Sequence, residues 1–401
     1  MNRTTEHFRS AGAPASALAA LLLLAPLVAG QQARTDESRP RARDLGIIIG
    51  RYPPGRLNAI TDVRGVRVGH LTLVSGEGKL RPGKGPVRTG VTVIVPAEGD
   101  FWNLKVQAGS FVLNGNGSAT GLMWIGESGN LEVPIALTNT LSVSDVHRGV
   151  IDWMLNKYPA VGVSDDTVVP VVLECDDSTL NDIRGRHVKP EHVLQALEKA
   201  SSGPVPEGAV GAGTGMMAYE FKGGIGTASR LLPKKVGSYT VGVLVNANHG
   251  ERHTLRVLGV PVGKEIKDLM PVERKDGSII LIAATDAPLT ARQLNRVAKR
   301  VMLGLARTGA VAHHGSGDVA VAFSTANRIP HYPKEPLVEL KVLSDAWLDD
   351  LFEAAEDAAE EAVLNALLAA DTVVGRDGNT AYALPHDRLT SLLRERGALG
   401  R

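Results

Sequence analysis

The sequence predicts a mixed α/β fold in which layers of helix lie over β-sheet. Short apolar runs rich in Val and Ile recur along the chain and are bounded by Gly, Asn and Asp, as buried strands are. Longer segments between them carry apolar residues at intervals of three and four, as on the buried face of a helix. Strands and helices mixed in this order pack as layers around a shared core.

The composition is that of a globular protein without a charge bias. The chain has 401 residues, of which 43% are hydrophobic and 22% charged, with 44 Lys and Arg against 43 Asp and Glu. This length permits two domains or one large α/β domain. Because the charges balance, no net field favours nucleic acid or an anionic membrane. We therefore expect no nucleic-acid partner, and no membrane association once a leader is removed.

The first 30 residues fit a secretory signal. Arg3 and Arg9 give a positive start, residues 17–29 are apolar, and Val28-Ala29-Gly30 fits a cleavage site of small residues. The apolar run is short for a membrane span and contains a proline. We expect removal of residues 1–30 on export.

A polar segment rich in Arg, Gln and Pro, residues 31–44, follows as an expected linker, and the fold is predicted to start near Leu45. The single cysteine, Cys175, excludes an intrachain disulfide. Export without disulfides agrees with a bacterial periplasm, so the expected location is periplasmic or secreted.

The strands follow from the apolar runs. They are expected within residues 60–70, at 91–95, within 110–122, and at 168–173, 239–245, 278–284 and 319–323.

The helices follow from the longer period. Val146, Val150 and Met154 repeat every four residues, and Ser144 is expected to cap that helix. Further helices are expected after Pro190, between a cap at Thr290 and a stop at Gly309, over residues 346–370, and after Pro385.

The junction Gly277-Ser278 joins a charged run to an apolar run and has two interpretations. Asp-Gly between strands is a strong signal for a β-hairpin. Alternatively, the chain cuts itself here. Glycine has the lowest steric cost of any residue when its carbonyl turns toward the side chain that follows it. A Ser that begins a chain also carries its own base, an α-amine with a pKa of about 7.7–8.0. Ser278 would then be a nucleophile.

Several well-known signatures do not fit. Gly126-Glu127-Ser128-Gly129 lacks the spacing of a nucleophile elbow, and the glycines of 211–215 do not form a dinucleotide fingerprint. His249 and His253 have the spacing of a metal pair, but Gly250 favours a loop, so a structural or surface role is expected. We expect no metal and no cofactor.

Eight short motifs occur in order along residues 45–395. They are Thr61-Asp62-Val63, Asn114-Gly115-Asn116-Gly117, Pro134-Ile135, Leu180-Asn181-Asp182-Ile183, Phe221-Lys222-Gly223-Gly224, Val243-Leu244-Val245, Gly277-Ser278-Ile279-Ile280 and Gly315-Ser316-Gly317-Asp318. Together they resemble the L-aminopeptidase/D-esterase-D-amidase family of self-processing serine peptidases, which includes the β-peptidyl aminopeptidases.

The resemblance implies a four-layer αββα sandwich of the N-terminal-nucleophile-hydrolase type. It implies one hydrolase domain over residues 45–401, cut between Gly277 and Ser278 into two chains. Ser278 is then the nucleophile. We also expect a homo-oligomer of the processed two-chain units.

The resemblance also assigns roles to other polar residues. Ser316 and Asp318 match a serine and a carboxylate that orient or tune the nucleophile. Asn248 matches an oxyanion-hole amide, and Glu174 matches a glutamate that holds the substrate's free amine. On local pattern alone these are turn, strand-end and rim residues.

Two positions depart from the family pattern. Some relatives carry Glu at Asp318, and several carry an aromatic residue at Asp176, which we place in substrate binding. An acid at Asp176 would repel a developing negative charge.

The expected function is an exported serine aminopeptidase or amidase that releases N-terminal residues from short peptides or amino-acid amides. It would act through an acyl-enzyme on Ser278. The alternatives are an acyltransferase of similar fold, which passes the acyl group to an amine, and a processed but inactive secreted binding protein.

Overall fold

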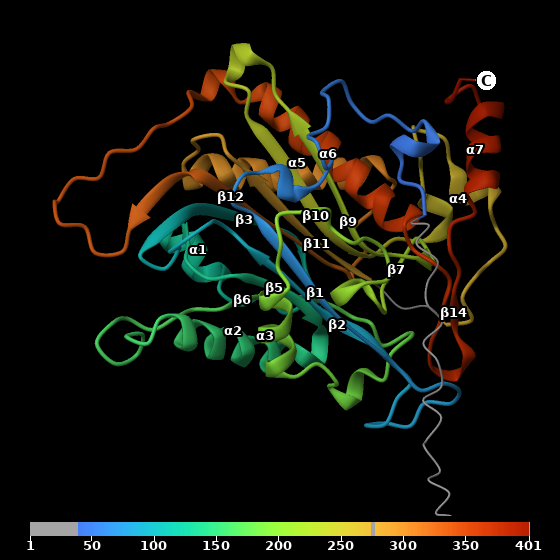
Figure 1. Ribbon diagram of the computed structural model, residues 1–401. Helices are drawn as coiled ribbons and strands as arrows, with labels where there is room; N and C mark the ends of the chain where they lie inside the picture. Colours follow the sequence, from blue (N-terminus) through green and yellow to red (C-terminus); the bar gives the residue numbers. More distant parts are fainter. Residues whose placement is uncertain (1–38, 274–276, 401) are drawn as a thin grey trace, which may run out of the picture. The chain divides into compact units, whose positions relative to one another are not determined.

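The computed structural model describes residues 39–273 and 277–400, which include two stacked β-sheets with helices on both outer faces (Figure 1). The expected signal segment, 1–30, and the expected linker up to residue 38 lie outside the described residues. From Arg39 onward the described chain forms one compact unit.

The smaller sheet has the strand order β1-β2-β5-β6. Its strands are β1 (Arg67–Ser75), β2 (Val87–Val95), β5 (Ile135–Asn139) and β6 (Val171–Cys175). β5 and β6 are parallel and the other pairs are antiparallel.

The larger sheet has the order β4-β3-β12-β11-β10-β9. Its strands are β4 (Asn130–Leu131), β3 (Leu104–Gly115), β12 (Gly317–Pro330), β11 (Ser278–Thr285), β10 (Thr240–Asn248) and β9 (Gly224–Leu231). β11 lies inside the sheet, antiparallel to β10 and parallel to β12.

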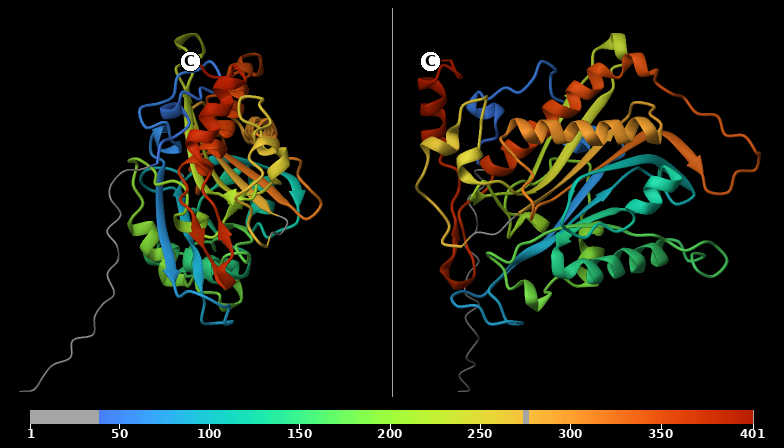
Figure 2. Two further views of the ribbon diagram at one scale, coloured as in Figure 1. Left: turned by 90° about the vertical axis from the view of Figure 1, so that its right-hand side faces the viewer. Right: turned by 180° about the vertical axis from the view of Figure 1, so that it is seen from behind.

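Helices cover the outer faces, so that the layers run α, β, β, α (Figure 2). Two helices pack on the smaller sheet, α2 (Val143–Lys157) and α3 (Pro190–Glu198), and two on the larger, α5 (Ala291–Arg307) and α6 (Asp349–Leu368). The four-layer sandwich expected from the family resemblance is therefore confirmed.

Shorter elements complete the unit. They are α1 (Leu122–Ser128), α4 (Val262–Glu265), α7 (His386–Glu395), and the strand pairs β7 (Met217–Ala218) with β8 (Phe221–Lys222) and β13 (Val373–Val374) with β14 (Thr380–Ala381).

β11 shows why the sequence carries an unbroken apolar run after Ser278. Ile279 and Leu281 belong to the core beneath α5 and α6, whereas Ile280 and Ile282 belong to the core shared with the smaller sheet. A strand buried on both faces has no polar positions to alternate with. Since side chains alternate along a strand, Ser278 lies on the side that faces the smaller sheet.

Several local predictions need correction. Ser144 lies inside α2 and does not cap it, because α2 begins at Val143 and the Asn139 side chain accepts from Ser142 N instead. Thr290 does cap α5, as predicted. Leu122, placed in a strand region, begins helix α1.

The hairpin interpretation of Gly277 is wrong. Residues 271–273 are not in a strand, and the partner of β11 in the antiparallel ladder, β10, is joined to it through residues 249–277. A two-residue turn therefore does not connect these strands.

The packed body begins before Leu45. Ala42 is fully buried in the core and donates its backbone N–H to Asn365 Oδ1 at 2.9 Å. Arg39 donates to the carbonyls of Leu368 and Leu384 at 2.9 and 2.8 Å. These residues were expected in the linker, but their backbone and side chains are tied to the C-terminal region.

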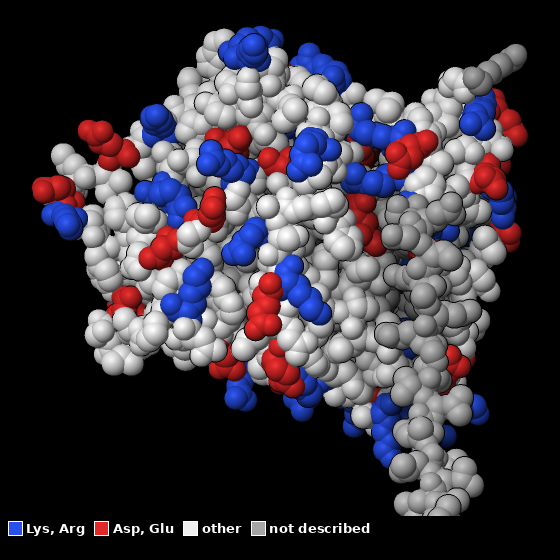
Figure 3. All heavy atoms as spheres, in the orientation of Figure 1, with Lys and Arg blue, Asp and Glu red and all other residues white. Residues whose placement is uncertain are grey.

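The charged surface agrees with the balanced composition. On the face shown in Figure 3, Lys and Arg are interspersed with Asp and Glu over the described elements. Across the described residues, the helices are either too short or too polar to cross a membrane.

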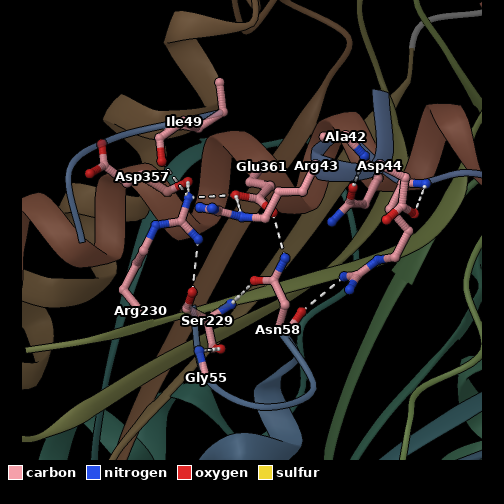
Figure 4. Close-up of polar contacts among 12 residues, drawn as sticks. Ala42, Arg43, Asp44, Ile49, Gly55, Asn58, Ser229, Arg230, Asp357 and Glu361 are labelled. Carbon is pink, nitrogen blue, oxygen red and sulfur yellow. Dashed lines mark hydrogen bonds and ion pairs between the residues drawn. The ribbon is translucent and has the colours of Figure 1, made fainter. Parts of the chain in front are cut away.

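A buried ion pair joins the N-terminal segment, β9 and α6 (Figure 4). Arg230 is fully buried, and its Nη2 lies 2.7 Å from Glu361 Oε2. Glu361 also accepts from Arg43 Nε at 2.9 Å and from Asn58 Nδ2 at 2.5 Å. Arg230 Nη2 donates further to the Ile49 carbonyl at 2.9 Å. Glu361 of α6 thus accepts from three side chains, two in the N-terminal segment and one in β9.

We predict that Glu361→Ala lowers the free energy of unfolding by about 3–5 kcal/mol, because Arg230 would remain charged and buried without its partner. Urea denaturation measures the loss. Arg292→Ala, which breaks the exposed Arg292–Asp345 pair, is the matched control and should cost far less. Equal losses in the two variants would contradict this account.

Candidate active site

Ser278 lies at the first position of β11, where the ladder register fixes its neighbours. It stands opposite Asn248 at the end of β10 and opposite Gly317 at the start of β12. Ser278 is only 6% exposed. The register therefore brings together three positions that lie far apart in the sequence.

Glycine is required at two positions beside this serine: Gly277, which precedes it in the chain, and Gly317, which lies opposite it on β12. A Cβ at Gly277 would lie 1.8 Å from the Asn248 carbonyl oxygen. A Cβ at Gly317 would lie 2.4 Å from the Asn116 carbonyl oxygen and 3.3 Å from Ser278 Oγ. Contacts this short cannot be relieved by backbone atoms, so only glycine lets the three chain segments approach.

Ser278 lines a cavity of about 320 Å³, which we call the Glu174 cavity. The other lining residues are Asn116, Gly117, Thr140, Glu174, Asp176 and Gly315. These come from the ends of both sheets, so the two sheets together form this cavity. Its volume is in the range of small-molecule sites.

Glu174, near the end of β6, presents a buried carboxylate to this cavity. Its Oε1 accepts from Ser118 N at 2.8 Å, and its Oε2 accepts from the Thr140 hydroxyl. Burial raises the pKa of Glu174, the two hydrogen bonds oppose that shift, and the charge of Asp176 adds to it. An ammonium ion beside Glu174 would stabilise the charged form.

Asn248 is held in one amide orientation. Its Oδ1 accepts from Met217 N at 2.8 Å, and its Nδ2 donates to the Asp176 carbonyl at 2.9 Å. An amide nitrogen carries two hydrogens, so Nδ2 retains one for a ligand. The backbone of Asp176, rather than its carboxylate, therefore contacts Asn248.

The carboxylate of Asp176 is turned toward its own chain, where Oδ1 accepts from Ser178 N at 2.7 Å. Such local contacts are typical of Asp in turns. The half-buried side chain still lines the Glu174 cavity.

Lys222 supports the turn that orients Asn248, a role that sequence reasoning missed. It is fully buried, and its Nζ donates to the carbonyls of Gly213, Met216 and Gly223 at 2.9, 2.7 and 2.7 Å. Burial lowers the pKa of Lys222 to about 7. A lysine within a glycine-rich apolar segment was the sequence feature that could have indicated this buried role.

Ser316 and Asp318 form a buried pair beside Gly317. The Ser316 hydroxyl donates to Asp318 Oδ1 at 2.7 Å. Burial raises the pKa of Asp318, while the Ser316 hydrogen bond and the charge of His313 oppose the shift. With Gly277, these two residues line a second cavity of about 340 Å³, the Gly277 cavity.

Asn379 anchors the chain that leads to Gly277, and sequence reasoning did not single it out. Its Oδ1 accepts from the backbone N–H groups of Val272 and Glu273 at 3.0 and 3.2 Å. Its Nδ2 donates to the Thr179 carbonyl at 3.2 Å. Val272 and Glu273 are thereby held to the C-terminal region.

His249 and His253 have the sequence spacing of a metal pair, but the structure places them in different environments. His249 is buried, whereas the side chain of His253 is 66% exposed. Within residues 39–273 and 277–400, no three His, Cys, Asp or Glu side chains are grouped so as to hold a metal ion.

The αββα sandwich with a serine at the start of an inner strand defines a serine hydrolase of the N-terminal-nucleophile class. The model of peptidase family S58 matches residues 58–381, so the chain belongs to that family. It is a serine aminopeptidase.

Comparison with individual proteins supports the same family. The β-peptidyl aminopeptidase BapA of Sphingosinicella microcystinivorans is 46% identical over 372 residues, covering 89% of this chain and 92% of the relative. The solved structure of the PH0078 protein from Pyrococcus horikoshii OT3 has a TM-score of 0.86 at 55% identity and covers 89% of this chain and 99% of its own.

A third similar structure is the L-aminopeptidase D-Ala-esterase/amidase from Ochrobactrum anthropi, described as a prototype of the serine aminopeptidases and a variant of the Ntn hydrolase fold. It has a TM-score of 0.84 at 42% identity and covers 90% of this chain and 100% of its own.

We predict that Asn248→Ala lowers kcat by about 10²–10³, the usual effect of removing one oxyanion donor. The assay is hydrolysis of an amino-acid p-nitroanilide, with mass spectrometry to check the chain state. Asn246→Ala is the control, since Asn246 is buried two positions earlier in β10 and its amide atoms have no hydrogen-bond partner within the described chain. Similar kcat values for Asn248→Ala and wild type would remove Asn248 from the site.

Proposed function

We propose that this protein is an exported, self-processing serine aminopeptidase that releases N-terminal residues from short peptides and amino-acid amides. One observation carries the proposal. Ser278 lies directly after a glycine that has no room for a side chain, and it lines the same cavity as the buried carboxylate of Glu174.

Self-cleavage would begin with attack of Ser278 Oγ on the Gly277 carbonyl carbon. The C–N bond breaks, the nitrogen takes a proton, and Gly277 becomes esterified to Ser278. Water then hydrolyses the ester, which leaves a carboxylate on Gly277 and a free α-amine on Ser278. That amine has an ordinary pKa near neutrality, so it can serve as the base for the same hydroxyl.

Peptide hydrolysis uses the same groups in sequence. The substrate ammonium binds Glu174, which places the carbonyl beside Ser278. The Ser278 amine takes the hydroxyl proton as Oγ attacks, and Asn248 Nδ2 donates to the oxyanion. The amine returns the proton to the leaving group, and water hydrolyses the acyl-enzyme. Ser316 and Asp318 orient the Ser278 amine.

The orientation of Asp176 supports an active enzyme over an inactive binding protein. Its carboxylate accepts from Ser178 N, and its carbonyl, rather than its charge, contacts the oxyanion donor Asn248. The Asp176 carboxylate therefore does not take the place of the Asn248 amide as the group that would contact the oxyanion.

Export and oligomerisation are part of the proposal. The leader motif of residues 1–30 supports export to the periplasm or beyond. The family resemblance motivates association of the processed units with further copies. Sedimentation as a single two-chain unit would exclude the oligomer.

We predict that the purified protein consists of two chains, residues 31–277 and 278–401, and that Ser278→Ala remains one chain. The variant lacks the hydroxyl that attacks Gly277. A denaturing gel with intact-mass analysis distinguishes the species. An active wild-type protein that stays in one piece would falsify self-cleavage.

We predict that the enzyme requires a free substrate amine because Glu174 is its charged partner. An amino-acid p-nitroanilide should be cleaved and its N-acetylated form should not. Glu174→Gln should still process itself but show a strongly raised KM, since the amide keeps the shape and loses the charge. Comparable kcat/KM values for the free and acetylated substrates would end the assignment to Glu174.

A further inference from the structure

The Gly277 cavity is separate from the Glu174 cavity, where the proposed peptide hydrolysis takes place, and only its residues Ser316 and Asp318 serve that reaction, by orienting the Ser278 amine. Its wall is formed by residues 310–313, by Gly277, and by the polar side chains of Glu220, His249, Glu251, Ser316 and Asp318. Val311, at its rim, is 59% exposed, so the cavity communicates with solvent. Ser278 lines the Glu174 cavity, so the bond from Gly277 to Ser278 joins residues of two different cavities.

His249 is the least satisfied polar group in this wall. It is 4% exposed, and neither Nδ1 nor Nε2 has a hydrogen-bond partner within the described chain. Its ring lies edge-on to Tyr219 with the centroids 4.9 Å apart. Burial lowers the pKa of His249 to about 3, so the ring is neutral and offers one donor and one acceptor.

Asp318 is the second residue of this wall that has a buried polar atom without a hydrogen-bond partner. Its Oδ1 accepts from Ser316, but its buried Oδ2 has no partner within the described residues. Buried polar atoms are costly unless hydrogen-bonded, and a polar cavity of this size accommodates ordered water. The two side chains together present a donor, an acceptor and a carboxylate beside Gly277.

The nearby carboxylate of Glu220 is engaged elsewhere, because its Oε2 accepts from Arg252 N at 2.9 Å. Among the described residues of this wall, the buried polar side-chain atoms without a hydrogen-bond partner are the two ring nitrogens of His249 and Asp318 Oδ2. A neutral imidazole with one donor and one acceptor, beside a carboxylate oxygen, can hold a water molecule by two or more hydrogen bonds.

We propose that the Gly277 cavity is the site of the water that hydrolyses the Gly277–Ser278 ester during self-cleavage. His249 positions this water, and the Asp318 carboxylate takes its proton as the water oxygen attacks the Gly277 carbonyl carbon. The ester C–O bond breaks, and the proton passes from Asp318 to Ser278 Oγ. This inference rests on the proposed self-cleavage.

The test compares His249→Phe with His249→Gln in the full-length protein. The phenylalanine fills the space and offers no hydrogen bond, so ester hydrolysis should slow by about 10² or more. The glutamine keeps a donor and an acceptor and should cleave nearly as fast as wild type. Chain state is followed by intact mass over time.

Hydroxylamine separates the ester step from the acyl shift. If His249→Phe stalls as the ester, hydroxylamine should cut it, leaving a Gly277 hydroxamate and a free Ser278 amine. The released enzyme should then hydrolyse an amino-acid p-nitroanilide with a kcat close to that of wild type, because His249 is not part of the Glu174 cavity.

Two results would overturn the inference. One is cleavage of His249→Phe at the wild-type rate, and the other is a folded, uncut His249→Phe that hydroxylamine does not release. Should His249→Phe fail to fold, Val311→Trp at the exposed rim of the same cavity carries the same expectations. A wild-type protein that stays uncut would instead contradict the proposed function itself.

Discussion

The site depends on one steric constraint, the close approach of Gly277 to the carbonyl of Asn248. With only 1.8 Å between that oxygen and a Cβ at residue 277, no other amino acid fits. The contact sets the register of β11 against β10 and so places Ser278 opposite Asn248. Gly317 repeats the constraint on the other side, where β12 pairs in parallel. Ser278 is thus positioned by backbone packing between β10 and β12.

Stacking of the two sheets then brings acidic groups to the region of Ser278. Glu174 comes from the smaller sheet and Asp318 from the larger, and burial raises the pKa of each. Buried carboxylates of this kind are expensive for folding. Their position near one serine is consistent with a site that binds an amine and transfers protons.

Much of this could be read from the sequence because it is local. The apolar runs predicted most of the strands of the two sheets, but not β4, β5 or β9. The family resemblance, rather than local pattern, singled out Asn248, Ser278 and Ser316. The role of Lys222 depends on three carbonyls of a folded turn. The role of Asn379 depends on a contact across about a hundred residues of sequence, and such pairing has no local signal.

Other features of the fold also depend on tertiary contacts that local pattern does not show. The Asp-Gly signal at residue 277 is correct for an isolated turn, but tertiary pairing of β11 with β10 and β12 overrides it. The polar composition of residues 39–44 suggested a linker, yet their arginines bind carbonyls and carboxylates of the C-terminal region. His249 was expected to be structural or exposed, and only the folded chain shows its ring in the wall of a cavity.

The most direct test of the account is to trap the acyl-enzyme. A slowly hydrolysed amino-acid ester is mixed with the enzyme, quenched in acid, and the chains are mapped by mass spectrometry. The account predicts that the chain beginning at Ser278 gains one aminoacyl group on the Ser278 hydroxyl. An aminoacyl group on any other residue, or turnover without a trapped acyl group on that chain, would contradict it.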